Sequence, residues 1–171
     1  MRTSPVFVSV TLALALAILS PSGAEADGAP SGWQKICSAT GANQICMVRD
    51  TIEIGRDDPA AFLIRPRQGD YLAVASLPAL KLDFFKNQNW QIDDGKVLNV
   101  PYTKCDRTGC AAMLAANQAF FDALQKGTAI IITGYLIDGT KVSAAFPLKG
   151  FAEAYLGSKS MSLDEYKKTA N

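Results

Sequence analysis

The sequence predicts a small all-β domain: an antiparallel β-sandwich or open barrel with one or two short helices, stapled by disulfides. Short apolar or alternating segments recur along the chain, separated by turn residues at intervals of about 8–12 residues, which is typical of sandwich and barrel strands. Four cysteines occur in two close pairs behind an export signal, and only one segment carries a complete helix pattern.

Residues 1–26 are predicted to be a cleaved signal peptide. Arg2 supplies positive charge, residues 6–19 form an apolar run, and a small-x-small site predicts cleavage after Ala26. The run is shorter than the roughly 20 apolar residues of a membrane-spanning helix. We therefore expect a periplasmic or secreted protein without stable membrane insertion after cleavage.

The rest of the chain is predicted to hold one domain. Residues 27–32 form a flexible leader, residues 33–157 the β domain, and residues 158–171 a polar C-terminal tail. The formal net charge is only +1 and the basic residues are scattered. This composition gives no reason to expect a nucleic-acid partner.

Strands are expected in the first two thirds of the domain, where polar turns at 40–43 and 56–59 separate the earliest ones. The segment 80–85 alternates apolar and polar residues, so one face should be buried. Asp94-Gly95 is a preferred two-residue hairpin turn. Ordered structure is expected to begin at 33–36, and the expected strands are 45–54, 61–64, 71–77, 80–85, 90–93 and 97–100.

A second hairpin is expected around Asp138-Gly139. Its first arm, 130–137, is apolar on both faces, which predicts a central position in a sheet. Its second arm, 141–148, alternates, so one face should meet solvent.

One helix has clear start and stop signals. Asn117 can cap its start, an apolar stripe follows, Lys126 lies in the last turn, and Gly127 ends it. A shorter helix is predicted over 151–156. Ser162 and Glu165 have capping-box spacing near the end of the sequence, where we expect a frayed turn.

The cysteines are expected to form crosslinks, because exported chains enter an oxidising compartment. Local pairing, Cys37 with Cys46 and Cys105 with Cys110, needs only local geometry and is favoured, although the spacing leaves the two crossed pairings open. A four-cysteine zinc site is disfavoured because eight residues separate the first pair. A redox catalyst is disfavoured because Cys-x-x-Cys is absent.

The sequence lacks the residues of the common catalytic sites. The chain contains no histidine, so it has no Ser-His-Asp triad, no Cys-His pair and no His-ligated metal site, and it lacks a phosphate-binding Gly loop. We expect no catalytic residue, no metal and no cofactor. A hydrolase based on two converging carboxylates is the least favoured function. Trp33, Trp90 and Tyr102 are the candidates for a binding surface.

Several motifs together resemble the invasion-associated locus B family of exported bacterial proteins, over about residues 33–157. These motifs are Trp33-x-x-x-Cys37 with Cys46, Leu77-Pro78, Asp93-Asp94-Gly95, Pro101-Tyr102-x-x-Cys105, Gly109-Cys110-x-Ala112, Leu124-x-x-Gly127 and Leu148-Lys149-Gly150-Phe151-x-x-Ala154. The resemblance implies a periplasmic or envelope-associated protein, linked in some pathogens to host-cell entry. It brings no catalytic residues, and it marks the four cysteines as disulfide partners.

Two hypotheses of binding follow. The first is a non-enzymatic envelope protein that binds a protein or envelope component, with a role in host-cell invasion where the organism is host-associated. The second is a periplasmic small-ligand binder, which would need a deep apolar pocket with convergent polar groups near Trp33, Trp90 or Tyr102.

Overall fold

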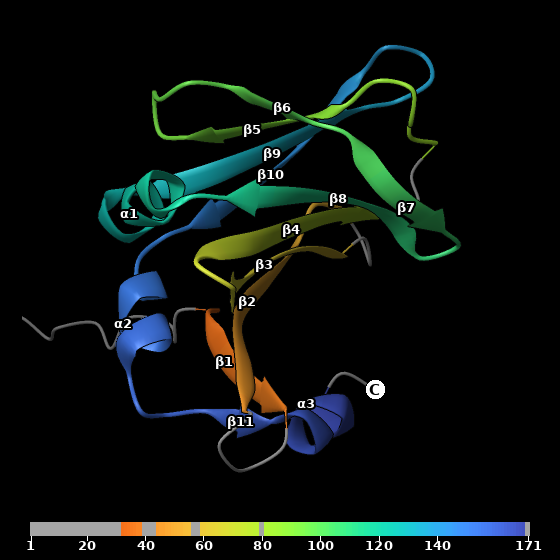
Figure 1. Cartoon of the computed structure of the whole chain (residues 1–171). Helices are drawn as coiled ribbons and strands as arrows, with labels where there is room; N and C mark the ends of the chain where they lie inside the picture. Colours follow the sequence, from red (N-terminus) through yellow and green to blue (C-terminus); the bar gives the residue numbers. More distant parts are fainter. Residues whose placement is uncertain (1–31, 39–43, 56–58, 79–80, 170–171) are drawn as a thin grey trace, which may run out of the picture.

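Two β-sheets make up most of the structure, a computed structural model that describes residues 32–38, 44–55, 59–78 and 81–169. The larger sheet has the strand order β11-β1-β2-β3-β4-β8-β7, and the smaller has the order β10-β9-β5-β6 (Figure 1). Only the pairing of β11 with β1 is parallel. This open, β-rich arrangement confirms the predicted fold class. The predicted signal peptide 1–26, leader residues 27–31 and the turns at 40–43 and 56–58 lie outside the described residues.

The larger sheet begins as a meander of four strands, in which β1 pairs with β2, β2 with β3 and β3 with β4. The chain then leaves this sheet and returns to it as a hairpin that adds to β4. Its strands are β1 (Gln34–Ser38), β2 (Ile45–Glu53), β3 (Pro59–Arg67), β4 (Asp70–Pro78), β7 (Tyr102–Asp106), β8 (Gly109–Ala116) and β11 (Met161–Ser162).

Two hairpins form the smaller sheet: β5 (Gln88–Ile92) with β6 (Leu98–Val100), and β9 (Ala129–Tyr135) with β10 (Lys141–Pro147). The doubly apolar strand β9 lies between β10 and β5, as the sequence predicts. Between β6 and β7 stands Pro101, which has no backbone N–H to donate to a ladder. The chain passes from the smaller to the larger sheet at this residue.

Three helices are described: α1 (Gln118–Lys126), α2 (Phe151–Leu156) and α3 (Leu163–Thr169). The Asn117 side chain accepts a hydrogen bond from the Phe120 backbone N–H, and Gly127 ends α1, so the predicted cap and stop are confirmed. None of the helices within the described ranges is long and apolar enough to cross a membrane.

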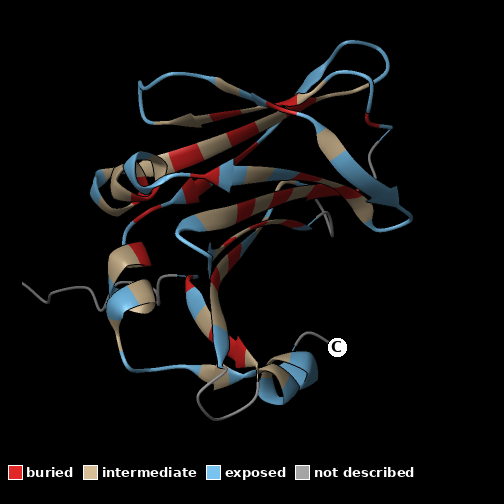
Figure 2. Cartoon of the chain, viewed as in Figure 1, coloured by how far each residue is buried: buried red, intermediate tan, exposed pale blue. Residues whose placement is uncertain are grey.

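The core lies between the two sheets, where buried residues line the facing strands (Figure 2). Phe62 on β3 is fully buried and lies near three other large aromatic residues. Its ring centroid is 6.1 Å from that of Trp33, 5.7 Å from that of Trp90 and 6.1 Å from that of Phe146. Strands from both sheets and the segment before β1 therefore share one aromatic centre.

Several predicted elements differ in the structure. Of the expected strand 80–85, the described residues 81–85 make a single bridge, Leu82 to Leu136. The backbone turns at residues 84–85, where the Asp83 carbonyl accepts the Lys86 N–H. The expected polar tail instead forms β11 and α3. There Ser162 and Glu165 exchange capping hydrogen bonds and β11 pairs with β1.

The predicted hairpin turns are in the right places but are longer than two residues. Residues 93–97 connect β5 to β6, and the β9–β10 connection folds back through hydrogen bonds of Leu136 with Thr140 and with Gly139. The φ angle of Gly139 is 86°, a left-handed value that glycine adopts without a steric penalty.

Candidate binding surface

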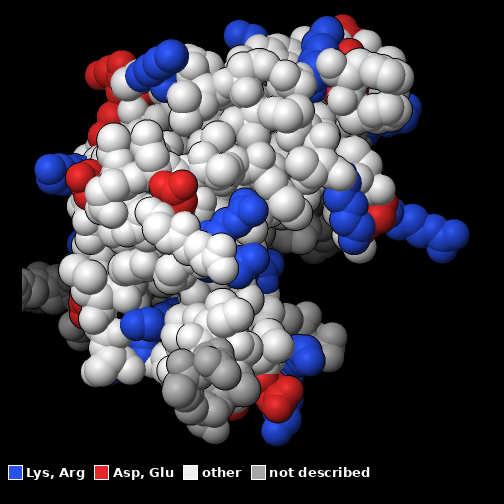
Figure 3. Space-filling view, in the orientation of Figure 1, with Lys and Arg blue, Asp and Glu red and all other residues white. Residues whose placement is uncertain are grey.

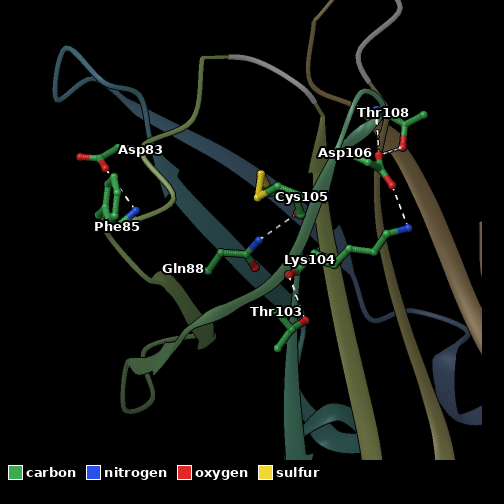
Figure 4. Close-up of a disulfide and its surroundings, with 10 residues drawn as sticks. Asp83, Phe85, Gln88, Thr103, Lys104, Cys105, Asp106 and Thr108 are labelled. Atoms are coloured by element: carbon green, nitrogen blue, oxygen red, sulfur yellow. Dashed lines mark hydrogen bonds and ion pairs between the residues drawn. A yellow bond between two sulfur atoms is a disulfide. The ribbon is translucent and has the colours of Figure 1, made fainter.

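Both disulfides join directly opposite residues on neighbouring strands of the larger sheet. Cys37 and Cys46 link β1 to β2, and Cys105 and Cys110 link β7 to β8 (Figure 4). These are the local pairs that the sequence favours, not the crossed ones. Because β7 is one edge strand and β1 is next to the other, the crosslinks hold both ends of this sheet.

A polar network closes the β7–β8 turn beside the second disulfide (Figure 4). The Asp106 carboxylate accepts from the backbone N–H and the hydroxyl of Thr108, at 2.9 and 2.6 Å, and pairs with the Lys104 ammonium at 2.8 Å. The bonds from Lys104 and Thr108 hold the pKa of Asp106 well below its ordinary range. This carboxylate therefore stabilises the β7–β8 turn.

Trp33 and Trp90, the first two candidates for a binding surface, are buried in the core, and each also lines one of two open pockets. Trp33 is 5% exposed, and its indole N–H donates to the Pro147 carbonyl. Trp90 is fully buried and donates to the Gln88 side-chain carbonyl at 2.8 Å. Each indole satisfies its one polar group inside the protein, which removes the cost of burying it.

Tyr102 is half-buried on β7 and points its hydroxyl inward. A Cβ at Gly134 on β9 would come within 2.9 Å of this oxygen. Burial raises the pKa of Tyr102, and the nearby Gln88 side chain lowers it. Among the described residues, however, no hydrogen bond of normal geometry reaches the hydroxyl. Tyr102 therefore fills the space between the two sheets, and the three predicted surface residues do not form one site.

The described residues offer little for acid–base or metal chemistry. Asp50 is the only buried acid among them, and burial raises the pKa of its carboxyl group. No group of three or more Cys, Asp or Glu residues within the described ranges could hold a metal ion. A carboxylate-pair hydrolase would need a second buried acid beside the first.

Two open pockets lie beside the tryptophans. A pocket of about 420 Å³ lies between the β5–β6 turn and α1, with Ile92, Leu98 and Phe120 among its apolar walls. The nearby Asp93 carboxylate is already bonded to Thr128 and Ala129. A second pocket of about 520 Å³ lies between Trp33 and the residues that follow α2.

A larger feature is the face of the seven-stranded sheet that points away from the smaller sheet, here called the outer face. Side chains alternate between the faces of a strand. Phe62 and Ile64 on β3 and Ala73 and Ala75 on β4 point into the core, so their neighbours point outward. By register, the outer face comprises Arg49 and Thr51 on β2; Ala61, Leu63 and Arg65 on β3; Leu72, Val74 and Ser76 on β4; and Ala111, Met113 and Ala115 on β8.

The middle row of the outer face is apolar across three strands. Leu63 lies opposite Val74, and Val74 opposite Met113. None of the three packs against the core cluster, and Met113 is 43% exposed. Figure 1 shows α3 against β1 and β11 at one end of this curved sheet and β7 at the other, and Figure 3 shows the surface indented between these ends.

Arginines border this apolar row. Arg49 and Arg65 are half-buried on the outer face, and no carboxylate of the described residues lies within 4 Å of either guanidinium. The Arg49 guanidinium lies 5.1 Å from the centroid of the Tyr166 ring on α3, a cation–π distance. Burial lowers the pKa of Arg49, while Asp50 raises it. The outer face therefore combines apolar side chains with cations that are available to pair.

The sequence shows that these segments form strands, but it does not show which side of each strand faces the core. Segments 61–64 and 71–77 are apolar at both odd and even positions. The pattern alone therefore gives no preference for which side meets the core. Register with β2 and β8 decides the matter.

Comparisons with known proteins agree on one family. The family model described as "Invasion associated locus B (IalB) protein" matches residues 33–159. Among solved structures, the crystal structure of invasion associated protein b from Bartonella henselae is similar, with a TM-score of 0.62 and 17% sequence identity. The similarity covers 73% of this chain and 89% of that chain. No curated protein matches. With the family model matching most of its length, this chain belongs to the invasion associated locus B family.

Proposed function

We propose that this protein is an exported, non-enzymatic binding protein of the cell envelope, and that its outer face binds a protein or another envelope component. The observation that carries the proposal is the apolar row Leu63–Val74–Met113, which lies outside the core cluster. An antiparallel sheet with one solvated face ordinarily carries polar residues on that face. An apolar face bordered by cations is instead typical of an interaction site.

Two half-buried arginines extend this argument to the partner's chemistry. A guanidinium held beside apolar side chains gains most from a carboxylate that arrives with a partner, because the partner also excludes water from the pair. Arg49 and Arg65 each lack a carboxylate within 4 Å among the described residues. A partner with acidic groups around an apolar centre fits this face.

Export is supported by the predicted signal peptide and by the two disulfides. Disulfides persist in oxidising compartments and are rare in the cytosol. The non-enzymatic assignment is supported by a chain without histidine and by a single buried acid among the described residues.

The proposal is tested by capture from periplasmic extract of the source organism after crosslinking, with mass spectrometry of the captured proteins. We compare the wild type with Met113→Glu on the outer face. Val97→Glu serves as the matched control, because Val97 is 46% exposed on the β5–β6 turn. We expect one partner that the wild type and V97E retain and M113E loses. Identical capture by all three proteins would count against the outer face.

The contribution to the envelope is tested separately in a deletion strain. We expect increased sensitivity to envelope stress, restored by the wild-type gene but not by M113E. The similar protein from Bartonella henselae is called invasion associated. If the source organism enters host cells, counting the host cells entered by the deletion strain and by the complemented strains tests whether this chain has a role in invasion.

A second candidate function, small-ligand binding, is favoured by the pocket beside α1. Its walls are apolar, and Lys96 and Lys126 lie at the pocket, which suits a small amphiphilic anion. Calorimetric titration with a medium-chain fatty acid tests it. A heat of binding that is measured for the wild type and lost in a Phe120→Asp variant would support this function. No heat of binding for the wild type would argue against it.

A further inference from the structure

Segment 81–86 and the β9–β10 connection lie at one end of the smaller sheet, far from α3 (Figure 1). These segments carry three exposed large apolar side chains. Phe85 is 86% exposed, Ile137 72% and Phe84 54%. The rings of Phe84 and Phe85 lie side by side with centroids 4.5 Å apart. We call Phe84 and Phe85, with Ile137 on the paired segment opposite Lys81, the aromatic tip.

Backbone hydrogen bonds hold the two segments of the aromatic tip together. The Asp83 N–H donates to the Tyr135 carbonyl at 2.7 Å, and the Ile137 N–H donates to the Lys81 carbonyl at 2.9 Å. The Asp83 carboxylate accepts from the Phe85 N–H at 3.3 Å, which fixes the turn that projects the ring outward (Figure 4). The tip is therefore presented by an ordered backbone.

Lysines flank the aromatic tip along the chain. Lys81, Lys86 and Lys141 are all exposed on the segments that carry or adjoin it. Two acids are close by, but each is engaged: Asp83 pairs with Lys86 at 3.6 Å, and Asp138 accepts from the Thr140 N–H at 2.9 Å. Three lysines and two acids give this end of the molecule a net charge of +1.

The geometry points to a lipid surface as the occupant, and we propose that the aromatic tip inserts into the interface of an anionic phospholipid bilayer. The Phe85 ring projects almost fully into solvent and the Phe84 ring beside it is more than half exposed, so no groove surrounds this pair to receive a peptide. Aromatic side chains gain at the boundary between headgroups and acyl chains, and flanking lysines gain from anionic headgroups. The aromatic tip is separate from the outer face, so the lipid proposal and the proposed partner site can be disproved independently.

The test is co-sedimentation of the protein, purified from the periplasm of an expression host, with vesicles of phosphatidylethanolamine and phosphatidylglycerol in equal parts. The variant F84S/F85S is compared with Leu156→Ser. Leu156 is a matched control because it is 72% exposed at the end of α2. We expect the wild type and L156S to partition equally and F84S/F85S to partition at least about tenfold less, because two apolar side chains no longer enter the interface.

Two further measurements separate the parts of the proposal. Vesicles of phosphatidylcholine alone should bind more weakly, and salt of about 1 M, where the Debye length falls to about 3 Å, should weaken binding to the anionic vesicles. Both variants change exposed residues, and unchanged circular dichroism verifies their folding. No sedimentation of the wild type with anionic vesicles, or equal sedimentation of F84S/F85S, would overturn the inference, as would equal binding to phosphatidylcholine.

Discussion

The indole nitrogen of Trp33 donates a hydrogen bond of 2.7 Å to the carbonyl oxygen of Pro147, 114 residues further along the chain. This bond joins the residue that precedes β1 of the larger sheet to the last residue of β10 in the smaller one. The Trp33 ring also lies edge-on to that of Phe151, with centroids 5.0 Å apart. One side chain thus ties both sheets and α2 together.

Trp33→Phe is expected to lower the free energy of unfolding by about 1–3 kcal/mol, because it removes the indole N–H and leaves the Pro147 carbonyl without this donor. Urea denaturation followed by circular dichroism measures the change. Val97→Ala, at an exposed turn position, is the control and should be nearly neutral. Equal midpoints for Trp33→Phe and the wild type would show that this bond contributes nothing.

Each disulfide is expected to contribute about 2–3 kcal/mol, because each closes a short loop of the unfolded chain. We predict a loss of this size for the paired variant C37S/C46S and for C105S/C110S, with the longer first loop losing slightly more. Chemical denaturation without reductant measures both. Mass spectrometry after alkylation of the unreduced wild type should detect no free thiol, and four alkyl groups on freshly isolated protein would contradict the crosslinks.

Asp93 makes stability depend on pH at the acidic end. Its carboxylate accepts from the Thr128 hydroxyl and from the backbone N–H groups of Ala129 and Thr128, and these bonds lower its pKa from the ordinary 3.8. A depressed folded-state pKa gives stability that is present above the unfolded-state value and is lost as the pH falls through the folded-state value. The stabilising contribution of Asp93 should therefore begin to fall at about pH 3.8 and be lost once the pH is below the lower folded-state pKa.

Asp93→Asn is the suitable change because the φ angle of residue 93 is 46°, and asparagine tolerates this left-handed conformation. We expect the variant to be less stable than the wild type at neutral pH and to lose less stability between pH values of about 5 and 2. Thermal unfolding across that range measures the slope. Parallel curves for the two proteins would show that the carboxylate charge is not involved.

Two tyrosines provide a matched test of buried polar groups. The Tyr102 hydroxyl has no partner among the described residues, whereas the Tyr135 hydroxyl accepts from the Asn89 side chain at 3.0 Å. Removing a buried, unpartnered hydroxyl relieves a desolvation cost of about 1–3 kcal/mol. Tyr102→Phe should therefore be neutral or stabilising, and Tyr135→Phe destabilising by about 1 kcal/mol. Denaturation midpoints that fall equally in both variants would contradict this difference.

Local features were predictable from the sequence because a few neighbouring residues determine them. Asn117 and Gly127 bound α1 as expected, since a cap needs only a side-chain oxygen three residues before a free N–H. Asp138-Gly139 marks a turn for the same reason. The cysteine pairs also formed locally, because each lies on two strands joined by a short connection.

Features that depend on distant pairing were not predictable. The segment 80–85 alternates like a strand, yet its described residues 81–85 have only one bridge, to Leu136 on the opposing segment, and its two phenylalanines are exposed. Residues 158–171 are predicted to be a polar tail, but within them β11 pairs with the edge of β1. Tyr166 on the following helix α3 lies against Arg49 of β2.

By itself the sequence determined a disulfide-stapled, β-rich member of its family, together with its turns and helix ends, because those follow from chemistry within a few positions. Only the tertiary structure decided that Trp33 and Trp90 are core residues and that Leu63, Val74 and Met113 share an outer face. The physical reason is that a strand apolar on both sides has no preferred face until its neighbours in the sheet and the opposing layer cover one of them.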